Sequence, residues 1–290
     1  FTESAQVFPE RKDKWESFAF PFIYGDSIYA IRFARDRSLS LVKRTADETD
    51  ELRMIPYDII SPLFHHERGI SAGGGYILWR EAIPDPRWGY RSYSDLRLYN
   101  VESGKTLDLT DNKKFIAAAL SADGTTAAAV EYIAAKGYSL ELFSIADMKN
   151  SGSYELNDAG HIYDPAIQGN LVALCTQEKE GNSIIIFDTE NGKKTRIIDT
   201  THLEHFRSPI FHNEYLFFVS DYTGIDNIYA VNLKNRKRFQ VTSVMYGAYF
   251  PSISPGNNAL LYNEYTLTGY KTVSSSIDPS AWISFEKLKK

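Results

Sequence analysis

Three segments of this chain repeat one pattern, and that repeat restricts the fold more than any other feature of the sequence. Residues 69–81, 119–131 and 252–264 align without a gap: a small or apolar stretch, a serine, turn residues, an apolar stretch and a glutamate. A repeat of roughly 40–50 residues built from short strands is typical of four-stranded blades arranged around an axis. The repeat therefore predicts a β-propeller.

Strand-forming runs separated by Gly, Asn, Asp and Pro turns divide the whole chain into six such units. No stretch has convincing 3.6-residue periodicity, so we predict an all-β fold, a six-bladed β-propeller of four-stranded antiparallel blades. We expect one domain over residues 1–290. The predicted blades cover residues 20–57, 66–110, 115–156, 161–198, 206–242 and 247–285.

The sixth unit lacks an evident outermost strand. Residues 281–285 could supply it, or the segment around residues 6–8 could pair there and close the ring. An unpaired edge would invite wrong association, so one of the two is expected to fill the position. We favour the N-terminal segment, about residues 1–18, because those residues have no other evident use.

Composition excludes several classes of function. The net charge is −5, which argues against nucleic acid as the main partner, because phosphate binding needs a basic face. The one cysteine, Cys175, lies in the apolar run 171–175 and is expected to be a buried thiol. No apolar run reaches the length needed to span a bilayer. Because the sequence begins with Phe1, we expect a processed form or a piece of a longer protein.

Motifs for catalysis or metal binding are missing from the sequence. There is no Gly-x-Ser-x-Gly elbow and no His-Glu-x-x-His, and residues 73–75 form the glycine turn of the repeat. The pairs His65/His66 and His202/His205 lack a recognisable third ligand. Asp221 and Asp226 fit turn positions better than a calcium site. We therefore predict no catalytic residue, no metal and no cofactor, and a non-enzymatic role.

One end of the predicted blades collects candidate binding residues. In a propeller blade the first strand begins, and the second ends, at the same rim. The position near the start of the first strand should therefore line the mouth of the central tunnel, and its candidate ligand residues are His66, Tyr163, Arg207 and Tyr249. Acidic residues end the second strand in four units, namely Glu81, Glu131, Asp221 and Glu264. These acids either bind a ligand or, as we favour, bond to turn amides and neighbouring blades.

The most irregular insertion, residues 82–92, lies at this same rim. Two prolines stiffen it, and the residue types are those enriched at interaction hot spots. Its candidate binding residues are Arg87, Trp88, Tyr90 and Arg91. The alternative is that Trp88 folds back over its blade as a plug.

The fifth unit has the most specific family pattern. Residues 216–229 read apolar strand, Ser-Asp, a Gly turn and Asn-Ile-Tyr, while residues 250–257 resemble a Pro-Ser-x-Ser-Pro-Asp-Gly element and residues 121–124 a partial copy. This pattern resembles the propeller repeat of TolB-like proteins. The resemblance implies a periplasmic or extracytoplasmic location and the propeller fold. Such propellers occur as free adaptors, as front domains of prolyl-oligopeptidase-type peptidases and as modules of larger envelope proteins, so fold alone does not define function.

We expect a non-enzymatic binding or scaffolding module for a protein or peptide, part of a larger cell-envelope protein, with its partner on the tunnel-mouth face. One alternative is the substrate-gating propeller of a peptidase whose catalytic domain lies outside this chain. The second is an enzyme acting on glycans in the funnel, which would require carboxylates or histidines to converge on a shared pocket.

Overall fold

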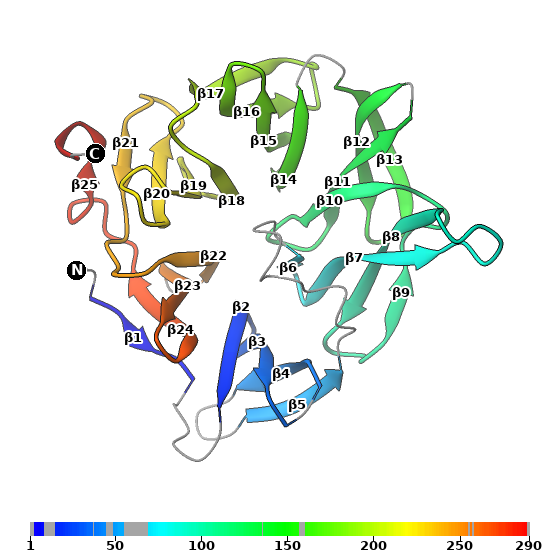
Figure 1. Ribbon diagram of the computed structural model, residues 1–290, viewed down its shortest axis with the longest axis horizontal. Coiled ribbons are helices and arrows are strands. Elements are labelled where there is room, and N and C mark those ends of the chain that lie inside the picture. Colours follow the sequence, from blue (N-terminus) through cyan, green and yellow to red (C-terminus); the bar gives the residue numbers. More distant parts are fainter. Residues whose placement is uncertain are drawn as a thin grey trace. The chain divides into compact units, whose positions relative to one another are not determined.

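The computed structural model describes residues 3–8, 15–36, 38–44, 49–54, 69–134, 136–156, 160–254, 256 and 258–288. These residues form six antiparallel sheets, the blades expected from the sequence, and a short 3-10 helix, η2 (Phe285–Lys287), near the C-terminus (Figure 1). The candidate His66 lies outside the described residues.

In blades 1 to 5 the strands lie in chain order from the first strand to the outer strand. Blade 1 contains β2 (Glu16–Tyr24), β3 (Ser27–Ala34), β4 (Ser40–Arg44) and β5 (Thr49–Met54). Blade 2 contains β6 (Ile70–Gly73), β7 (Tyr76–Pro84), β8 (Ser92–Asn100) and β9 (Thr106–Asp108). Blade 3 contains β10 (Phe115–Leu120), β11 (Thr126–Ile133), β12 (Gly137–Ser144) and β13 (Lys149–Glu155). Blade 4 contains β14 (His161–Gln168), β15 (Leu171–Glu178), β16 (Gly181–Asp188) and β17 (Lys194–Thr201).

The last two blades also take strands from the chain ends. Blade 5 contains β18 (Phe206–His212), β19 (Tyr215–Ser220), β20 (Asn227–Asn232), β21 (Arg238–Gln240) and a fifth strand, β25 (Ile283–Ser284). Blade 6 contains β22 (Ala248–Ser254), β23 (Ala259–Thr266), β24 (Gly269–Ser276) and, as its outer strand, β1 (Ala5–Gln6) from the N-terminus.

The chain divides into two compact units of three blades each. Unit 2, residues 58–202, holds blades 2 to 4, and unit 1, residues 1–57 and 203–290, holds blades 5, 6 and 1. Within unit 2 the first strands β6, β10 and β14 are neighbours, and within unit 1 β22 contacts both β18 and β2. Apolar side chains fill the space between adjacent blades, as in the cluster of Val130, Leu140 and Leu174 between blades 3 and 4. The prediction that residues 1–290 form one domain stays a prediction.

The close approach of blades 2 and 3 explains the glycine-rich turn of the repeat. Gly74 has φ +54°, and a Cβ built on it would lie 2.1 Å from the Asp123 carbonyl oxygen. Gly124, opposite, has φ +71° and faces the backbone of Gly73 and Gly74. Glycine is needed here because any side chain would collide with the neighbouring turn. The glycine turn at residues 73–75 therefore allows blade 2 to pack against blade 3.

Four first strands share a bulge immediately before a proline. Phe20, Asp164, Ser208 and Phe250 each precede Pro and have φ between 43° and 55°, a region that non-glycine residues seldom enter. The ladder to the second strand shifts register at each of these places. A bulge changes the direction of the side chains beside it. The residues that directly precede three of the bulges are the candidates Tyr163, Arg207 and Tyr249.

The N-terminal segment is held to blade 6 and to blade 1. Ala5 and Gln6 pair with Ser274 and Val273 of β24, and the following Phe8 is 2% exposed. The Phe8 ring stacks on Phe18 of β2, with centroids 4.4 Å apart. Residues from the start of the chain thus supply the strand that blade 6 would otherwise lack.

The C-terminal segment covers the outer edge of blade 5. Gln240 pairs with Ile283, and Trp282 packs edge-on against Tyr215 and Phe217, with centroids 5.1 and 5.5 Å apart. Next to this strand, the Arg238 guanidinium lies 4.0 Å from the Phe285 ring. Residues 283–284 therefore pair on blade 5, whereas the sequence placed them among the options for blade 6.

Arg238 occupies a cage of aromatic rings. The rings of Phe218 and Tyr229 lie 5.1 and 5.0 Å from its Cζ, and both guanidinium Nη atoms bond to the Glu204 carboxylate. The two side chains are only 10% and 6% exposed. Burying a charge is costly unless the charge is paired and hydrogen-bonded. Here Glu204 provides the ion pair, and the rings provide cation–π contacts.

Candidate functional site

The end of each blade at which its first and third strands begin is called the mouth end here. The hairpin between the second and third strands turns at this end. Within unit 2, the mouth ends of neighbouring blades are bonded: the Ser94 amide of blade 2 donates to the Lys113 carbonyl before β10. In blade 3, the Tyr132 amide donates to the Lys114 carbonyl. All the sequence candidates that the structure describes lie at mouth ends.

In blade 2 the mouth-end hairpin is the longest departure from the repeat. Strands β7 and β8 pair as far as Pro84 and Ser92, and the loop between them extends away from the other strands of its sheet (Figure 1). One side chain organises the loop. Asp85 Oδ1 accepts from the amides of Arg87 and Trp88 at 2.8 and 3.2 Å. An Asp that bonds the amides two and three residues ahead closes a tight local turn.

The rest of the loop is cross-braced. The Asp85 amide donates to the Arg91 carbonyl at 2.9 Å, and the Arg91 amide donates to the Trp88 carbonyl at 2.8 Å. Arg91 Nε lies 3.6 Å from Asp85 Oδ2, and its guanidinium lies 5.0 Å from the Tyr93 ring. The Asp85 side chain is only 9% exposed, so its carboxylate bonds within the loop and has little contact with water.

This bracing leaves the aromatic side chains of the loop in water. Trp88 is 65% exposed and Tyr90 is fully exposed, and Arg87 is exposed beside them. Trp88 therefore does not fold back over its blade as a plug. Large aromatic residues are seldom this open in a folded chain, and when exposed they are typical of contact surfaces.

Tyr163 lies at the mouth end of blade 4 and belongs to a row of rings. It is half-buried, and its ring stacks with that of His161 at 5.8 Å and 21°. His161 in turn contacts Tyr138 of blade 3, with ring centroids 5.7 Å apart and the Tyr138 hydroxyl 2.8 Å from Nδ1. The structure thus joins one sequence candidate to two residues that the sequence reading passed over.

The candidates of unit 1 are engaged with one carboxylate. Arg207 Nη1 donates to Asp226 Oδ1 at 2.6 Å, and the two side chains are 16% and 14% exposed. Burial, together with the nearby Asp226 carboxylate, raises the pKa of the Tyr249 hydroxyl far above its usual value. That hydroxyl stays protonated at any physiological pH. Arg207 and Tyr249 therefore form a local polar cluster around Asp226 in unit 1.

Three of the four acids at the ends of the second strands have a partner in or beside their own blade. Glu81 accepts from Arg97 Nε at 2.8 Å, and Glu131, which is 7% exposed, lies 3.7 Å from Lys113 Nζ. Asp221 accepts from the backbone amide of His205 at 2.8 Å and lies 3.0 Å from its ring Nδ1. Burial opposes the ionisation of Asp221, but the His205 hydrogen bonds outweigh it, so its pKa lies below the usual value. Asp221 thus bonds to a turn amide, as we favoured for the acids, whereas Glu81 and Glu131 pair with basic side chains.

Among the described residues, no group of three His, Cys, Asp or Glu side chains is placed to hold a metal ion. Within the same ranges, no helix has the length and apolar character needed to cross a membrane.

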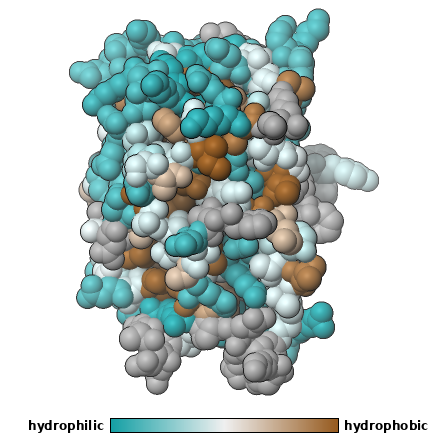
Figure 2. Space-filling model, turned by 90° about the vertical axis from the view of Figure 1, so that its left-hand side faces the viewer, coloured by the Kyte–Doolittle hydropathy of each residue, from teal (hydrophilic) through white to brown (hydrophobic). Residues whose placement is uncertain are grey.

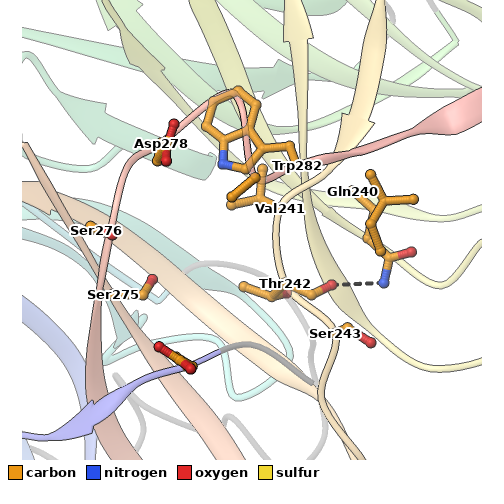
Figure 3. A pocket seen from close by; sticks show the side chains of 11 residues that line it. Gln240, Val241, Thr242, Ser243, Ser275, Ser276, Asp278 and Trp282 are labelled. Carbon is orange, nitrogen blue, oxygen red and sulfur yellow. Dashed lines mark hydrogen bonds between the residues drawn. The ribbon is translucent and has the colours of Figure 1, made fainter.

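Unit 1 also contains a groove that the sequence did not indicate. It has a volume of about 350 Å³ and lies where the outer strands of blades 5 and 6 meet the C-terminal segment. Trp282 and Val241 form one side, and Ser275, Ser276 and Asp278 lie across from them (Figure 3). Two of its polar side chains have local partners: Gln240 Nε2 donates to the Thr242 carbonyl at 2.7 Å, and Asp278 accepts from the amide and hydroxyl of Ser280.

Figure 2 shows the side of the molecule that carries β1, β21 and β25. Hydrophobic residues there form small patches separated by polar ones. The groove itself is lined by both polar and apolar residues. Trp282 was the one signal in the sequence that could have drawn attention to this region.

Comparisons with known proteins show which fold the chain shares. No protein-family model and no curated protein sequence matches it. Among solved structures, a protein described as TolB from Agrobacterium tumefaciens is 14% identical with a TM-score of 0.55, over 82% of this chain and 83% of that one. The β-propeller domain of the Trilobed protease from Pyrococcus furiosus is 12% identical with a TM-score of 0.55, over 91% and 97%.

A prolyl endopeptidase is similar in the same way. It is 13% identical with a TM-score of 0.57, and the match covers 93% of this chain but only 48% of the endopeptidase. The chain thus spans about half the length of that enzyme. Five four-stranded sheets, one five-stranded sheet and these likenesses together confirm the predicted fold: the chain is a six-bladed β-propeller similar to that of TolB.

Proposed function

We propose that this chain is a non-enzymatic module that binds a protein or peptide partner through the mouth end of blade 2. The contact surface is the loop of the β7–β8 hairpin, with Trp88 and Tyr90 as anchors and Arg87 and Arg91 beside them. The observation that supports it best is the exposure of Trp88, 65%, on a loop that is braced by its own hydrogen bonds.

The physical reason lies in the cost of binding. A side chain that must be immobilised loses rotamer freedom, and a loop that must be ordered loses more. The Asp85 carboxylate and the two backbone bonds across the loop have already ordered residues 85–91. Trp and Tyr then bury a large area with few rotatable bonds. A rigid loop with exposed aromatic residues is therefore suited to specific contact.

The neighbouring carboxylates favour binding over catalysis. Glu81 and Glu131 are held by Arg97 and Lys113, respectively. A glycan-cleaving funnel needs two carboxyl groups that face one substrate across a few ångströms. In unit 2, Glu81 and Glu131 are therefore engaged in ion pairs with residues of the blades. The likeness to TolB supports an extracytoplasmic location and a protein partner in the cell envelope, in keeping with the expectation from the sequence.

The test is affinity capture with the tagged chain from a cell-envelope extract, comparing wild type with the Trp88→Ala and Arg87→Ala double variant. The matched control is Leu107→Ala on β9 of the same blade, where Leu107 is 39% exposed. We expect one partner to be recovered by wild type and by the control, and its recovery to fall at least about tenfold with the double variant. Equal recovery by all three folded proteins would end the proposal.

A second candidate function is the propeller of a peptidase. It is favoured by the similarity to the prolyl endopeptidase and to the Trilobed protease propeller. In that case the propeller gates substrates for a catalytic domain outside this chain. The full open reading frame decides between the two: an adjoining hydrolase domain with a nucleophile elbow supports the peptidase, and its absence supports the binding module.

A further inference from the structure

The groove at the outer strands of blades 5 and 6 is negatively charged. Its lining includes two acidic residues, Glu3 and Asp278, and contains no Lys, Arg or His. The pairing of Ala5 with Ser274 brings Glu3 beside the end of β24, and Asp278 follows that strand by two residues. The volume of about 350 Å³ is within the range of small-ligand sites.

The two carboxylates lack a positive partner. Both side chains are exposed, and among the described residues neither forms an ion pair. Asp278 accepts both Ser280 bonds, at 3.0 and 2.7 Å, on Oδ1, which leaves Oδ2 without a partner in the described part of the chain. The bonds from Ser280 hold the pKa of Asp278 below its usual value, so this carboxylate is charged at neutral pH.

Other acids of the same unit are neutralised within the fold. Glu204 pairs with Arg238, and Asp226 pairs with Arg207. The groove is therefore a place where a positive charge from outside the chain would complete the electrostatic pairing.

The remaining lining combines a fixed apolar wall with hydroxyl groups. Trp282 and Val241 pack against the hydrophobic core of blades 5 and 6, and their remaining surface lines the groove. Ser275 and Ser276 lie across from them (Figure 3). A ligand that suits this lining has positive charges, N–H donors and an aliphatic stem between them.

The arrangement suits an organic cation better than a metal ion. Calcium takes six to eight oxygen ligands at short range. Within the described ranges, no three His, Cys, Asp or Glu side chains come together in that way. Glu3 and Asp278 belong to opposite ends of the chain, and a flexible ligand with two charged ends can reach both.

We propose that the groove binds an aliphatic diamine or polyamine. Its ammonium groups, which are protonated at neutral pH, pair with the carboxylates of Glu3 and Asp278 through charge-assisted hydrogen bonds. Its methylene chain packs along Trp282 and Val241, as the stem of a lysine side chain does on an apolar surface. The serine hydroxyls accept the N–H groups that remain.

This inference does not depend on the proposed function. The groove belongs to blades 5 and 6 of unit 1, and the β7–β8 hairpin belongs to blade 2 of unit 2. Either surface can bind when the other does not, and the assay below uses defined amines that need no partner from an extract.

The test is isothermal titration calorimetry of the full chain with 1,5-diaminopentane at low ionic strength. Two comparison probes separate charge from shape: n-pentylamine has the same methylene chain with one ammonium, and Mg²⁺ has the same charge without the chain. We expect one saturable site for the diamine and affinity at least about threefold weaker for n-pentylamine. Mg²⁺ should give no saturable binding in the groove.

Three kinds of variant locate the site. Asp278→Asn and Glu3→Gln should each weaken diamine binding about threefold to fivefold. Ser276→Lys, at an exposed position, adds an ammonium to the groove and should abolish binding. Glu286→Gln is the matched control, because it removes the same charge from an exposed residue of η2 outside the groove, and it should leave the affinity unchanged.

Three results would overturn the inference. One is the lack of saturable binding of the diamine. Another is an equal affinity for the diamine and n-pentylamine, or displacement of the diamine by an equal concentration of Mg²⁺. The third is an equal effect of Asp278→Asn and Glu286→Gln, which would mean that the amine follows the net charge of the chain and not the groove.

Discussion

The mouth-end loops of blades 2 and 5 use the same kind of residue for opposite purposes. In blade 5, Asp221 and Asp226 bind His205 and Arg207, and the Asp226 carbonyl accepts from the Ala248 amide of blade 6. In blade 2, Asp85 binds the backbone of its own loop. The first loop joins blades of unit 1, and the second holds its aromatic residues out in water. An acidic turn residue therefore indicates its role only through the group to which it bonds.

The predicted consequence is a division of effects: substitutions in blade 5 should change stability, and those in the blade 2 loop should change binding. The largest effect is expected for Arg238→Ala. It removes the cation from the aromatic cage and leaves the Glu204 carboxylate, 6% exposed, without its ion-pair partner. We expect a loss of about 3–5 kcal/mol in the free energy of unfolding, measured by urea denaturation. A midpoint equal to that of wild type would show that the cage contributes nothing.

Arg207→Ala comes next. The bond to Asp226 is charge-assisted and mostly buried, so its loss should cost about 2 kcal/mol of stability. Partner capture by the blade 2 loop should not change. If the variant kept full stability and lost partner capture instead, Arg207 would be a binding residue and the division between the loops would fail.

Trp88→Ala should show the reverse behaviour. The side chain is mostly in water, so the free energy of unfolding should stay within about 0.5 kcal/mol of wild type. The affinity for the partner, measured by surface plasmon resonance, should fall about tenfold or more. A clear drop in the unfolding midpoint would indicate that Trp88 packs on the fold after all.

Asp85→Ala tests the bracing of the loop. Without the carboxylate, the amides of Arg87 and Trp88 lose their acceptor, and the loop must be ordered when the partner binds. We expect roughly a threefold to tenfold loss of affinity with a faster dissociation rate. Asp85→Asn keeps an acceptor and should recover most of the affinity. Equal behaviour of the two variants would count against preorganisation.

The smallest effect concerns acid. The pKa of Asp221 in the folded chain lies below the ordinary value of about 3.9. Asp221 therefore contributes stability above its unfolded pKa, and that contribution is lost as the pH falls through its folded pKa. We expect the urea midpoint of wild type to fall more steeply below about pH 4 than that of Asp221→Asn. Parallel curves would show that the pairing with His205 contributes no stability.

The local part of this structure could be predicted from the sequence, and the non-local part could not. Runs of strand-forming residues and the turn residues between them located the strands, because both signals depend on near neighbours along the chain. The repeat placed Tyr163, Arg207 and Tyr249 at comparable positions, and the long insertion marked Trp88. The repeat did not predict that Arg207 donates a hydrogen bond to Asp226. These residues are nineteen positions apart, and the register of two strands brings them together.

The other surprises have the same origin. Residues 283–284 pair on blade 5, and Trp282 packs on Tyr215, contacts set by long-range packing of the chain end. The cross-strand pairs Tyr132/Tyr138 and Tyr265/Tyr270 have a sequence signal that could have pointed to them. Tyr132 and Tyr265 each follow a glutamate, and Tyr138 and Tyr270 each follow a glycine. Only the register of the second and third strands brings each pair together.

The most direct test of the central claim is site-specific photo-crosslinking. A benzophenone amino acid replaces Trp88 in one chain and Leu107 in another, and each is irradiated in the presence of the envelope extract. We expect one discrete adduct from position 88 and none from position 107 of the same blade. Absence of an adduct at 88, or the same adduct from both positions, would contradict the claim that the blade 2 loop is the binding surface.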